Sequence, residues 1–502
     1  MCRIAAVLIA VSLSFASASA ADGPVIKIDS GALSGTSTGT ADVYKDIPYA
    51  AAPVGALRWE PPALPAGWTG TRDASQYGPI CPQPPRPEAA AAAVGANLPQ
   101  SEDCLSLNVW APKAAKNAPV MVWIHGGAHR FGSGASPLYD GSAFARDGVV
   151  LVTINYRLGI LGYFAHPALT AAAKSGEPLG NYGAMDQIAA LQWVQRNIAA
   201  FGGDPRNVTV FGESAGGASI LYLLATPSAK GLFAKAIVES GGGWSAPETL
   251  APKEAEGVTF ARNAGLADAT VAQLRALPVD KTLTLPVSLG FGPFVDGRLI
   301  PETPAQAFAS GHAIDVPLLI GSNSFEASLM KSFSIPAANI LNRLTPAERA
   351  IYGGETTNDE ALAEAVFTDF AMGAPAHWTA AQASTGAPSW LYHFSYVPTL
   401  MRGRVEGARH GSEIPFVFDT LSTITARFNI QPTPEDSTVE TEMHAAWVAF
   451  AKTGNPGWTA YTPANDTLME FDSTSGPKTG FRKTQYDALD KAMLPRLDLH
   501  RP

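Results

Sequence analysis

The chain has 502 residues, of which 46% are hydrophobic and 16% charged, a composition typical of a globular protein with ample material for a large core. Its formal net charge is −9, and no stretch is rich in lysine or arginine. This charge pattern argues against nucleic acid as a partner.

The first twenty residues have the features of an export signal. Arg3 supplies a positive start, residues 4–15 are mostly apolar, and residues 18–20 read Ala-Ser-Ala, a small-residue cleavage site. The apolar run is too short to span a membrane. We therefore predict a signal peptide over 1–20, cleavage near Ala20, and a secreted or periplasmic protein. A cytoplasmic protein with an apolar tail is the alternative.

Cleavage would remove Cys2 and leave Cys81 and Cys104. Two cysteines in an exported protein are most simply explained by a disulfide bond. Two buried free thiols are the alternative.

Short apolar runs alternate with helical patterns along the chain, which predicts a mostly parallel sheet with helices on both faces. Each run is bounded by Gly, Pro, Asn or Ser, as buried strands usually are. The predicted strands cover 120–124, 149–154, 207–211, 236–238, 316–320 and 390–394.

Three helices follow from the pattern. Asp186 is placed to cap the first, which has apolar residues at helical spacing up to 198. A second begins just after Ser214 and runs through Leu224 to Pro227, and it is apolar on nearly all sides, so we expect it to be buried. A third covers 441–452. The proline- and alanine-rich stretch 82–99 is predicted to be an exposed loop.

We expect residues 21–502 to form one catalytic domain. Two long segments, about 244–310 and 327–405, lie between the predicted strands and catalytic candidates, and residues 327–388 look helical and irregular. We interpret them as insertions that shape the mouth of the active site.

The sequence Gly-Glu-Ser-Ala-Gly at 212–216 matches a nucleophile elbow, with a predicted strand before it and a small-residue helix after it. Such a turn projects the Ser214 hydroxyl into a pocket, and flanking glycines relieve the crowding. The N–H of Ala215 would then be an oxyanion donor at a positive helix terminus.

Residues 125–128 read His-Gly-Gly-Ala and follow the first predicted strand. Small residues at a strand end let backbone N–H groups approach a developing oxyanion. An ordinary glycine turn is the alternative, which the nucleophile elbow downstream makes weaker.

A nucleophilic serine needs a base, and the base needs a carboxylate that orients it. His410 lies in a loop after a predicted strand, whereas His393 lies inside a strand and His444 inside a helix. Glu326 follows a predicted strand, whereas Asp315 precedes that strand, at the wrong end for a site in an open parallel sheet. His410 and Glu326 are therefore the candidates for base and acid.

Together with three further motifs, these residues make the sequence resemble the type-B carboxylesterases, which include cholinesterases and bacterial p-nitrobenzyl esterases. The resemblance covers nearly the whole mature chain. It rests on Ile-Pro-Tyr-Ala at 47–50 with Leu-Arg-Trp at 57–59, Ser-Glu-Asp-Cys-Leu at 101–105, Phe-Gly-Glu-Ser-Ala-Gly-Gly at 211–217, and His-Gly-Ser-Glu-Ile-Pro-Phe at 410–416.

The resemblance implies an α/β-hydrolase fold, a serine esterase activity and no cofactor or metal. The implied residue roles are a triad of Ser214, Glu326 and His410, oxyanion donors at Gly127, Ala128 and Ala215, a supporting second serine at Ser240, a disulfide between Cys81 and Cys104, and ion pairs that join Arg58 to Glu102 and Arg157 to Asp186. Small-molecule esters are the implied substrates.

The sequence departs from the family after the oxyanion glycines, where the family usually has an aromatic residue. Here His129 and Arg130 stand before Phe131. Either these two side chains point to solvent, which we favour, or one of them contacts a polar or anionic group of the substrate.

Two other functions remain open on the sequence alone. The first is a related acyl chemistry, such as amide, thioester or lactone cleavage, because fold and triad are shared among these activities. The second is a non-catalytic recognition module with the same fold, which the presence of serine, acid and histidine together disfavours. The natural ester and the oligomeric state are not determined by the motifs.

Overall fold

The computed structural model describes residues 23–85, 97–244, 247–284, 290–353, 358–426 and 429–499. The predicted signal peptide lies outside the described residues, as do residues 86–96 of the predicted proline-rich loop.

The strands are β1 (Val25–Ile28), β2 (Gly31–Ser34), β3 (Thr36–Ser37), β4 (Ala41–Pro48), β5 (Thr71–Asp73), β6 (Ser106–Pro112), β7 (Ala118–Ile124), β8 (Val150–Ile154), β9 (Gly203–Glu213), β10 (Lys235–Glu239), β11 (Leu318–Asn323), β12 (Ser389–Phe394), β13 (Thr467–Phe471) and β14 (Gly476–Thr479). All six strands predicted from the sequence are present, each within a few residues of its expected bounds.

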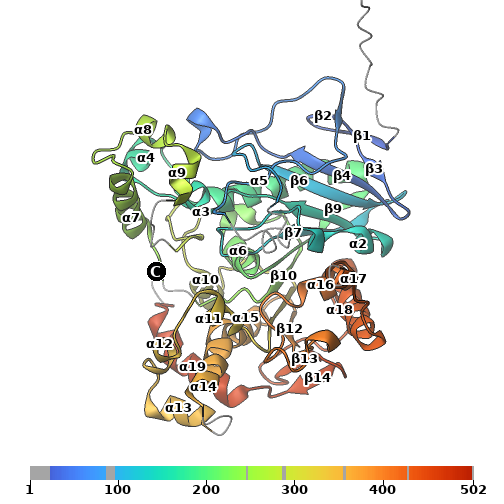
Figure 1. Cartoon of the computed structure of the whole chain (residues 1–502), viewed down its shortest axis with the longest axis vertical. Helices are drawn as coiled ribbons and strands as arrows, with labels where there is room; N and C mark the ends of the chain where they lie inside the picture. The colour runs from blue at the N-terminus through green and yellow to red at the C-terminus, as the bar shows by residue number, and fades with distance from the viewer. Residues whose placement is uncertain are drawn as a thin grey trace, which may run out of the picture.

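An 11-stranded sheet in the order β14-β13-β12-β11-β10-β9-β7-β8-β6-β4-β3 forms the centre of the molecule (Figure 1). Its middle strands, from β13 through β8, pair in parallel, and antiparallel strands extend both edges. A separate 3-stranded sheet, β1-β2-β5, lies near the N-terminus. This confirms the predicted α/β-hydrolase fold with a mostly parallel sheet. The sequence did not predict the antiparallel strands of the first half.

The helices are α2 (Ser142–Arg146), α3 (Gly159–Gly162), α4 (Pro167–Ala172), α5 (Tyr182–Asn197), α6 (Ala215–Leu224), α7 (Leu250–Asn263), α8 (Val271–Arg275), α9 (Val279–Thr284), α10 (Pro304–Ser310), α11 (Ser328–Ser332), α12 (Ala337–Leu341), α13 (Pro346–Tyr352), α14 (Asp359–Thr368), α15 (Ala374–Ala383), α16 (Ile414–Phe418), α17 (Leu421–Ala426), α18 (Pro434–Thr453) and α19 (Lys483–Met493). A π-helical turn, Asp369–Gly373, joins α14 to α15.

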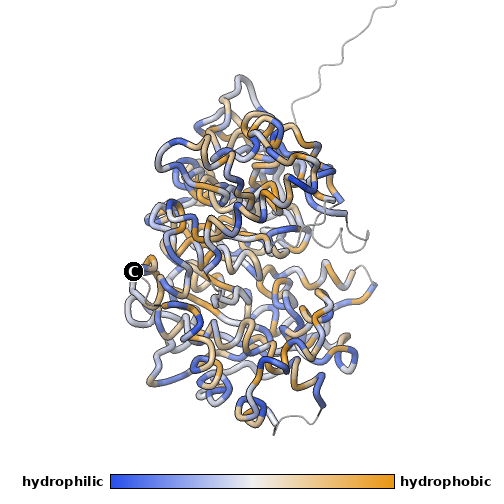
Figure 2. The backbone as a smooth tube through the Cα atoms, turned by 90° about the vertical axis from the view of Figure 1, so that its left-hand side faces the viewer, coloured by the Kyte–Doolittle hydropathy of each residue, from blue (hydrophilic) through white to orange (hydrophobic). Residues whose placement is uncertain are grey.

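Two apolar cores lie on the two faces of the large sheet, because successive side chains of a strand point to opposite faces. In β7, Val120 and Val122 belong to the core that contains α5, α6 and α15, whereas Met121 and Trp123 belong to the core that contains α2, α16 and α18. Figure 2 shows hydrophobic segments gathered in the interior of the molecule. Burial on both faces explains why these strands are continuous apolar runs rather than alternating ones.

Two helix boundaries differ from the sequence predictions. Helix α5 begins at Tyr182, so Asp186 lies inside the helix rather than at its cap. Asp186 is fully buried and forms a bidentate ion pair with Arg157, and this tertiary contact accounts for a carboxylate in the middle of a buried helix. Helix α18 begins at Pro434, where Thr433 and Asp436 form a capping box ahead of the predicted start.

In the part of the chain that the structure describes, no helix combines the length and apolar character needed to cross a membrane.

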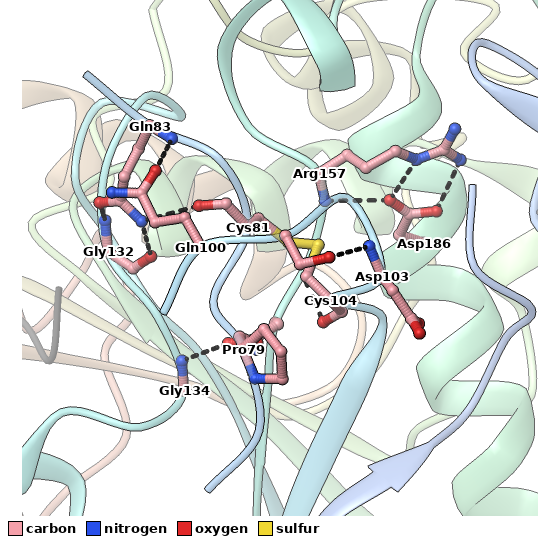
Figure 3. The surroundings of a disulfide bond; sticks show 12 residues. Pro79, Cys81, Gln83, Gln100, Asp103, Cys104, Gly132, Gly134, Arg157 and Asp186 are labelled. Atoms are coloured by element: carbon pink, nitrogen blue, oxygen red, sulfur yellow. Dashed lines mark hydrogen bonds and ion pairs between the residues drawn. A yellow bond between two sulfur atoms is a disulfide. The ribbon is translucent and has the colours of Figure 1, made fainter. Parts of the chain in front are cut away.

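Cys81 and Cys104 form a disulfide bond with an S–S distance of 2.04 Å, which confirms the predicted pairing (Figure 3). The bond lies next to a hydrogen-bonded link to the glycine-rich loop after β7. Gln83 donates to the carbonyl oxygen of Gly132 (3.0 Å) and accepts from the N–H of the same residue (2.9 Å). The predicted ion pair between Arg58 and Glu102 is also present.

We expect replacement of both cysteines by serine to lower the free energy of unfolding. Residues 81 and 104 are 23 positions apart, and on the chain-entropy model a loop of this size contributes about 3 kcal/mol. Urea denaturation of the double variant measures this loss. The wild-type protein unfolded in reductant is the control, and equal urea midpoints for oxidised wild type and variant would contradict the expectation.

Candidate active site

The candidate site lies at the carboxyl ends of the central strands, where parallel strands in register bring distant segments together. Ile124 pairs with Gly212, Glu213 with Glu239, and Glu239 with Gly321. The loops that follow β7, β9, β10 and β11 therefore meet at one edge of the sheet. These loops carry the histidine-glycine motif, Ser214, Ser240 and Glu326.

Ser214 lies on a sharp turn between β9 and α6, with φ 56° and ψ −123°. A non-glycine residue in this region is strained, and such strain concentrates at functional sites. The flanking glycines are needed for close packing, because a Cβ would lie 2.5 Å from the carbonyl oxygen of Ile124 at Gly212 and 1.9 Å from it at Gly216. The elbow is thus pressed against the end of β7.

The loop after β7 lies directly against this elbow. A Cβ on Gly126 would lie 2.7 Å from the carbonyl oxygen of Glu213 and 3.0 Å from Cβ of Ser214. Gly127 has φ 105°, and its carbonyl oxygen closes a tight turn by accepting from the N–H of Arg130 (3.0 Å).

Three backbone donors are available near Ser214. Among the described residues, the N–H groups of Gly127, Ala128 and Ala215 have no hydrogen-bond partner. Ala215 is also the first residue of α6, whose positive end is at the elbow. Unpaired N–H donors beside a strained serine are what an oxyanion hole requires.

Glu326 and His410 form a short contact although they lie 84 positions apart in the sequence. Nδ1 of His410 lies 2.5 Å from Oε2 of Glu326, whose side chain is fully buried. The other carboxylate oxygen, Oε1, accepts from the hydroxyl of Ser240 (2.5 Å) and the N–H of Asn323 (2.7 Å). These three contacts fix the carboxylate and, through it, the imidazole ring.

The second ring nitrogen of His410 faces the elbow. Nε2 lies 3.0 Å from Oε1 of Glu213, the residue before Ser214, and it makes no hydrogen bond to the Ser214 hydroxyl in the described structure. Catalytic hydrogen bonds are often poorly aligned before substrate binds and tighten in the substrate complex. The ring therefore lies between the acid and the elbow.

Three further buried glutamates belong to this region, and the sequence analysis did not identify them: Glu213 and Glu413 act on His410, and Glu239 interacts with Glu213. Burial raises the pKa of Glu213 to about 7 and that of Glu239 to about 8, and it raises the pKa of Glu413 well above its usual value. Glu413 accepts a hydrogen bond from the Asn323 amide, and Glu239 accepts from the indole N–H of Trp447 (2.7 Å). Glu213 and Glu239 directly precede Ser214 and Ser240, and Glu413 is three residues after His410. This closeness in the sequence to candidate site residues is the one signal that could have identified them as part of the site.

Burial alone would lower the pKa of His410, but the charges of Glu213 and Glu326 outweigh that effect and raise it to about 10. A general base must be neutral to accept a proton. The neighbouring carboxylates therefore favour the imidazolium, which is the charged form that a serine mechanism generates after proton transfer.

We expect Glu213→Gln to shift the acidic limb of the kcat/KM profile to lower pH. Removing the charge 3.0 Å from Nε2 lowers the pKa of His410, so the ring becomes neutral at a lower pH. An opposite charge this close shifts a pKa by about 1 to 3 units. Rates measured across pH for wild type, the variant and Glu442→Gln, an exposed control on α18, test this. An acidic limb that stays in place would be inconsistent with the assigned coupling.

The other candidates from the sequence lie elsewhere. His393 is buried within β12, and His444 in α18 bonds to the carbonyl oxygen of Val417 (2.8 Å) and to Asp147 (3.0 Å). Asp315 precedes β11 and accepts the N–H of Ala387 (2.6 Å) at the opposite end of the strand from Glu326.

The expectation that His129 and Arg130 point to solvent is wrong for His129. Its side chain is buried, and Nε2 lies 2.9 Å from the hydroxyl of Ser219 in α6. The positive φ of 53° turns the residue inward, toward the helix that begins at the elbow. Arg130 is partly exposed, with its guanidinium 5.7 Å from the ring centre of Phe131 and 5.8 Å from that of Phe291.

A cavity of about 450 Å³ adjoins the site. Its wall includes His129 and Gly241, the residues that directly follow Ala128 and Ser240, so the cavity opens beside the elbow. The two segments interpreted as insertions both contribute to it. Its aromatic and apolar lining includes Leu221, Tyr222, Trp244, Phe291, Pro293 and Ala371, and one carboxylate, Glu248, is present.

Comparison with known proteins agrees with this geometry. The family model described as the carboxylesterase family matches residues 22–362 and 353–489. The chain is 38% identical to the para-nitrobenzyl esterase of Bacillus subtilis (strain 168), over 89% of this chain and 95% of the relative, and 34% identical to the liver carboxylesterase of Sus scrofa, over 82% and 81%. A solved structure of a PNB esterase superimposes with a TM-score of 0.83 at 35% identity and covers 93% of this chain and 99% of that one. The protein therefore belongs to the carboxylesterase family and is a carboxylic ester hydrolase of the serine hydrolase class.

Proposed function

We propose that the protein is a secreted carboxylesterase that hydrolyses small-molecule esters through an acyl-enzyme on Ser214. The observation that carries this proposal is the chain of contacts from Ser240 through Glu326 to His410, which ends beside the strained serine. Secretion rests on the sequence of residues 1–20 alone.

In the proposed mechanism, His410 takes the proton of Ser214 as the hydroxyl attacks the ester carbonyl. The N–H groups of Gly127, Ala128 and Ala215 stabilise the oxyanion, and His410 then gives the proton to the leaving alcohol. Water repeats the attack on the acyl-enzyme, with His410 again as base.

Glu326 holds the Nδ1–H tautomer of His410 and stabilises the imidazolium that forms in each half-reaction. Ser240 and the N–H of Asn323 saturate its second oxygen, so the carboxylate cannot rotate away from the ring without losing two hydrogen bonds. We assign Ser240 a supporting role on this basis.

The lining and volume of the cavity support a preference for short and medium acyl esters. About 450 Å³ is at the lower end of the range for small-molecule pockets, and the lining is mainly apolar. We expect faster hydrolysis of p-nitrophenyl butyrate than of p-nitrophenyl palmitate, measured as kcat/KM for a series of chain lengths. A profile that rises toward the longest chains would contradict this substrate class.

The same panel tests Arg130, whose guanidinium pairs with no carboxylate among the described residues. Half-esters of a dicarboxylic acid, compared with neutral esters of equal length, measure any preference for an anionic substrate group. If Arg130→Ala leaves the ratio of the two rates unchanged, Arg130 has no role in selecting anionic esters.

A further inference from the structure

His129 connects two elements that the proposed oxyanion hole needs to hold together. It directly follows Ala128 in the loop after β7, and its Nε2 lies 2.9 Å from the hydroxyl of Ser219 in α6. The imidazole also packs edge-on against Tyr163, with 5.1 Å between ring centres. Its carbonyl oxygen accepts the N–H of Gly159 (2.6 Å). The side chain is 6% exposed, so these contacts are shielded from water.

The hydroxyl of Ser219 connects His129 to helices α5 and α6. This hydroxyl donates to the carbonyl oxygen of Ala215 (2.9 Å), one turn back in α6. A hydroxyl has one donor and two acceptor positions. The amide of Gln187 in α5 donates to the same hydroxyl (3.1 Å), and Nε2 of His129 is a further group bonded to it. Burial lowers the pKa of His129 to about 4, so near neutral pH the ring is uncharged and carries a single N–H.

The loop that carries two of the proposed oxyanion donors is strained. Gly127, Ala128 and His129 have φ values of 105°, 55° and 53° in succession. Positive φ is unfavourable for the two residues that have a Cβ, and such a conformation persists only when surrounding contacts hold it. Ala128 is exposed, so its own side chain supplies no packing for this purpose. The buried contacts of His129, the next residue in the sequence, can hold the loop in this conformation.

We propose that His129 is a positioning residue of the oxyanion hole, which fixes the N–H groups of Gly127 and Ala128 relative to that of Ala215 through its hydrogen bond to Ser219. The inference rests on the proposed function. Ser219 lies one turn after Ala215, so the bond joins the strained loop to the first turn of the helix that supplies the third donor. His129 has no hydrogen bond or ring contact with Ser214 or His410 in the described structure, and it acts on the reaction only through the loop.

Three single variants, and the double variant that combines His129→Phe with Ser219→Ala, test this role. His129→Phe keeps a ring against Tyr163 but removes Nε2, and Ser219→Ala removes the hydroxyl that bonds to it without changing the loop. Gln187→Leu is the matched control, because it removes a different hydrogen bond of Ser219 and leaves the bond to the loop intact. Melting temperatures of all variants identify any loss that is due to unfolding.

We expect kcat to fall about 10- to 100-fold in His129→Phe and in Ser219→Ala, because a misplacement of about 1 Å in a catalytic group has an effect of this size. KM is expected to change less than about threefold, since the donors act on the transition state. The double variant should lose no more kcat than the single variant with the larger loss, because both substitutions remove the same bond. Gln187→Leu should stay within about threefold of wild type.

Binding of a trifluoromethyl ketone separates positioning from a general structural role. This probe adds to the serine and leaves a charged oxygen in the oxyanion hole, so its affinity should fall by the same factor as kcat/KM. Wild-type kcat in His129→Phe, additive losses in the double variant, or an unchanged affinity for the ketone would each overturn the inference.

Failure of the proposed function gives a different result. A wild-type protein that neither hydrolyses any ester nor binds the ketone would contradict the serine mechanism and the oxyanion hole together. Calorimetric titration with the ketone requires no turnover, so it reports on the oxyanion hole even if the natural substrate is not an ester in the panel.

Discussion

Ser214→Ala is expected to lower kcat for p-nitrophenyl butyrate by about a millionfold, the scale of loss when the nucleophile of such a triad is removed. The reason is that the hydroxyl forms the bond to the acyl carbon in the proposed mechanism, and alanine offers no nucleophile at this position. The backbone of the elbow is retained, so the oxyanion donors and the cavity persist. KM should therefore change much less than kcat.

One further measurement and one control variant accompany Ser214→Ala. Mass spectrometry of the protein treated with a fluorophosphonate should place one adduct on the peptide that contains Ser214 in wild type and none there in Ser214→Ala. Ser332→Ala, an exposed serine in α11, is the matched control and should keep wild-type rates. Hydrolysis by Ser214→Ala at the wild-type rate would assign the activity to another group. A wild type that never reacts with the probe would favour a non-catalytic recognition module.

Glu326→Gln is expected to lower kcat about 10⁴-fold, as the loss of a carboxylate does in other serine triads. The carboxylate is fully buried and accepts from His410 at 2.5 Å. An amide in this place can donate to Nδ1, which holds the ring in the tautomer that cannot accept the serine proton at Nε2. It also removes the charge that stabilises the imidazolium.

Asp315→Asn is the control for this variant, because it makes the same chemical change at the other end of β11. Asp315 accepts a backbone N–H that an asparagine can also satisfy. We expect its kcat to match wild type. Steady-state rates with stopped-flow measurement of acylation compare the two variants, and equal losses in both would show that the Glu326 effect is one of folding rather than of catalysis.

Much of the site could be predicted from local sequence. The nucleophile elbow is specified within five residues, because the strained turn needs glycines at 212 and 216 and a strand and helix on either side. The buried strands were identifiable as well, since a strand covered on both faces is a continuous apolar run. The capping box at Thr433 lay beyond the apolar pattern, and the start of α18 was placed too late for that reason.

Other features depend on contacts between distant positions. Ser240 and Glu326 are 86 residues apart, and Glu326 and His410 are 84 apart. Family resemblance indicated their roles, but composition and spacing did not place them within hydrogen-bond distance. The parallel register of β10, β11 and β12 does so, by aligning the ends of the strands that these three residues follow.

The sequence by itself determined the fold class, the strained serine turn and the disulfide partners, because each depends on residue types within short windows or on there being only two cysteines beyond the predicted signal peptide. Only the tertiary structure decided that His129 turns inward to Ser219 and that buried glutamates surround His410. The physical reason is that burial and charge coupling arise when side chains from separate strands and helices come together, and no local pattern records which distant side chains will do so.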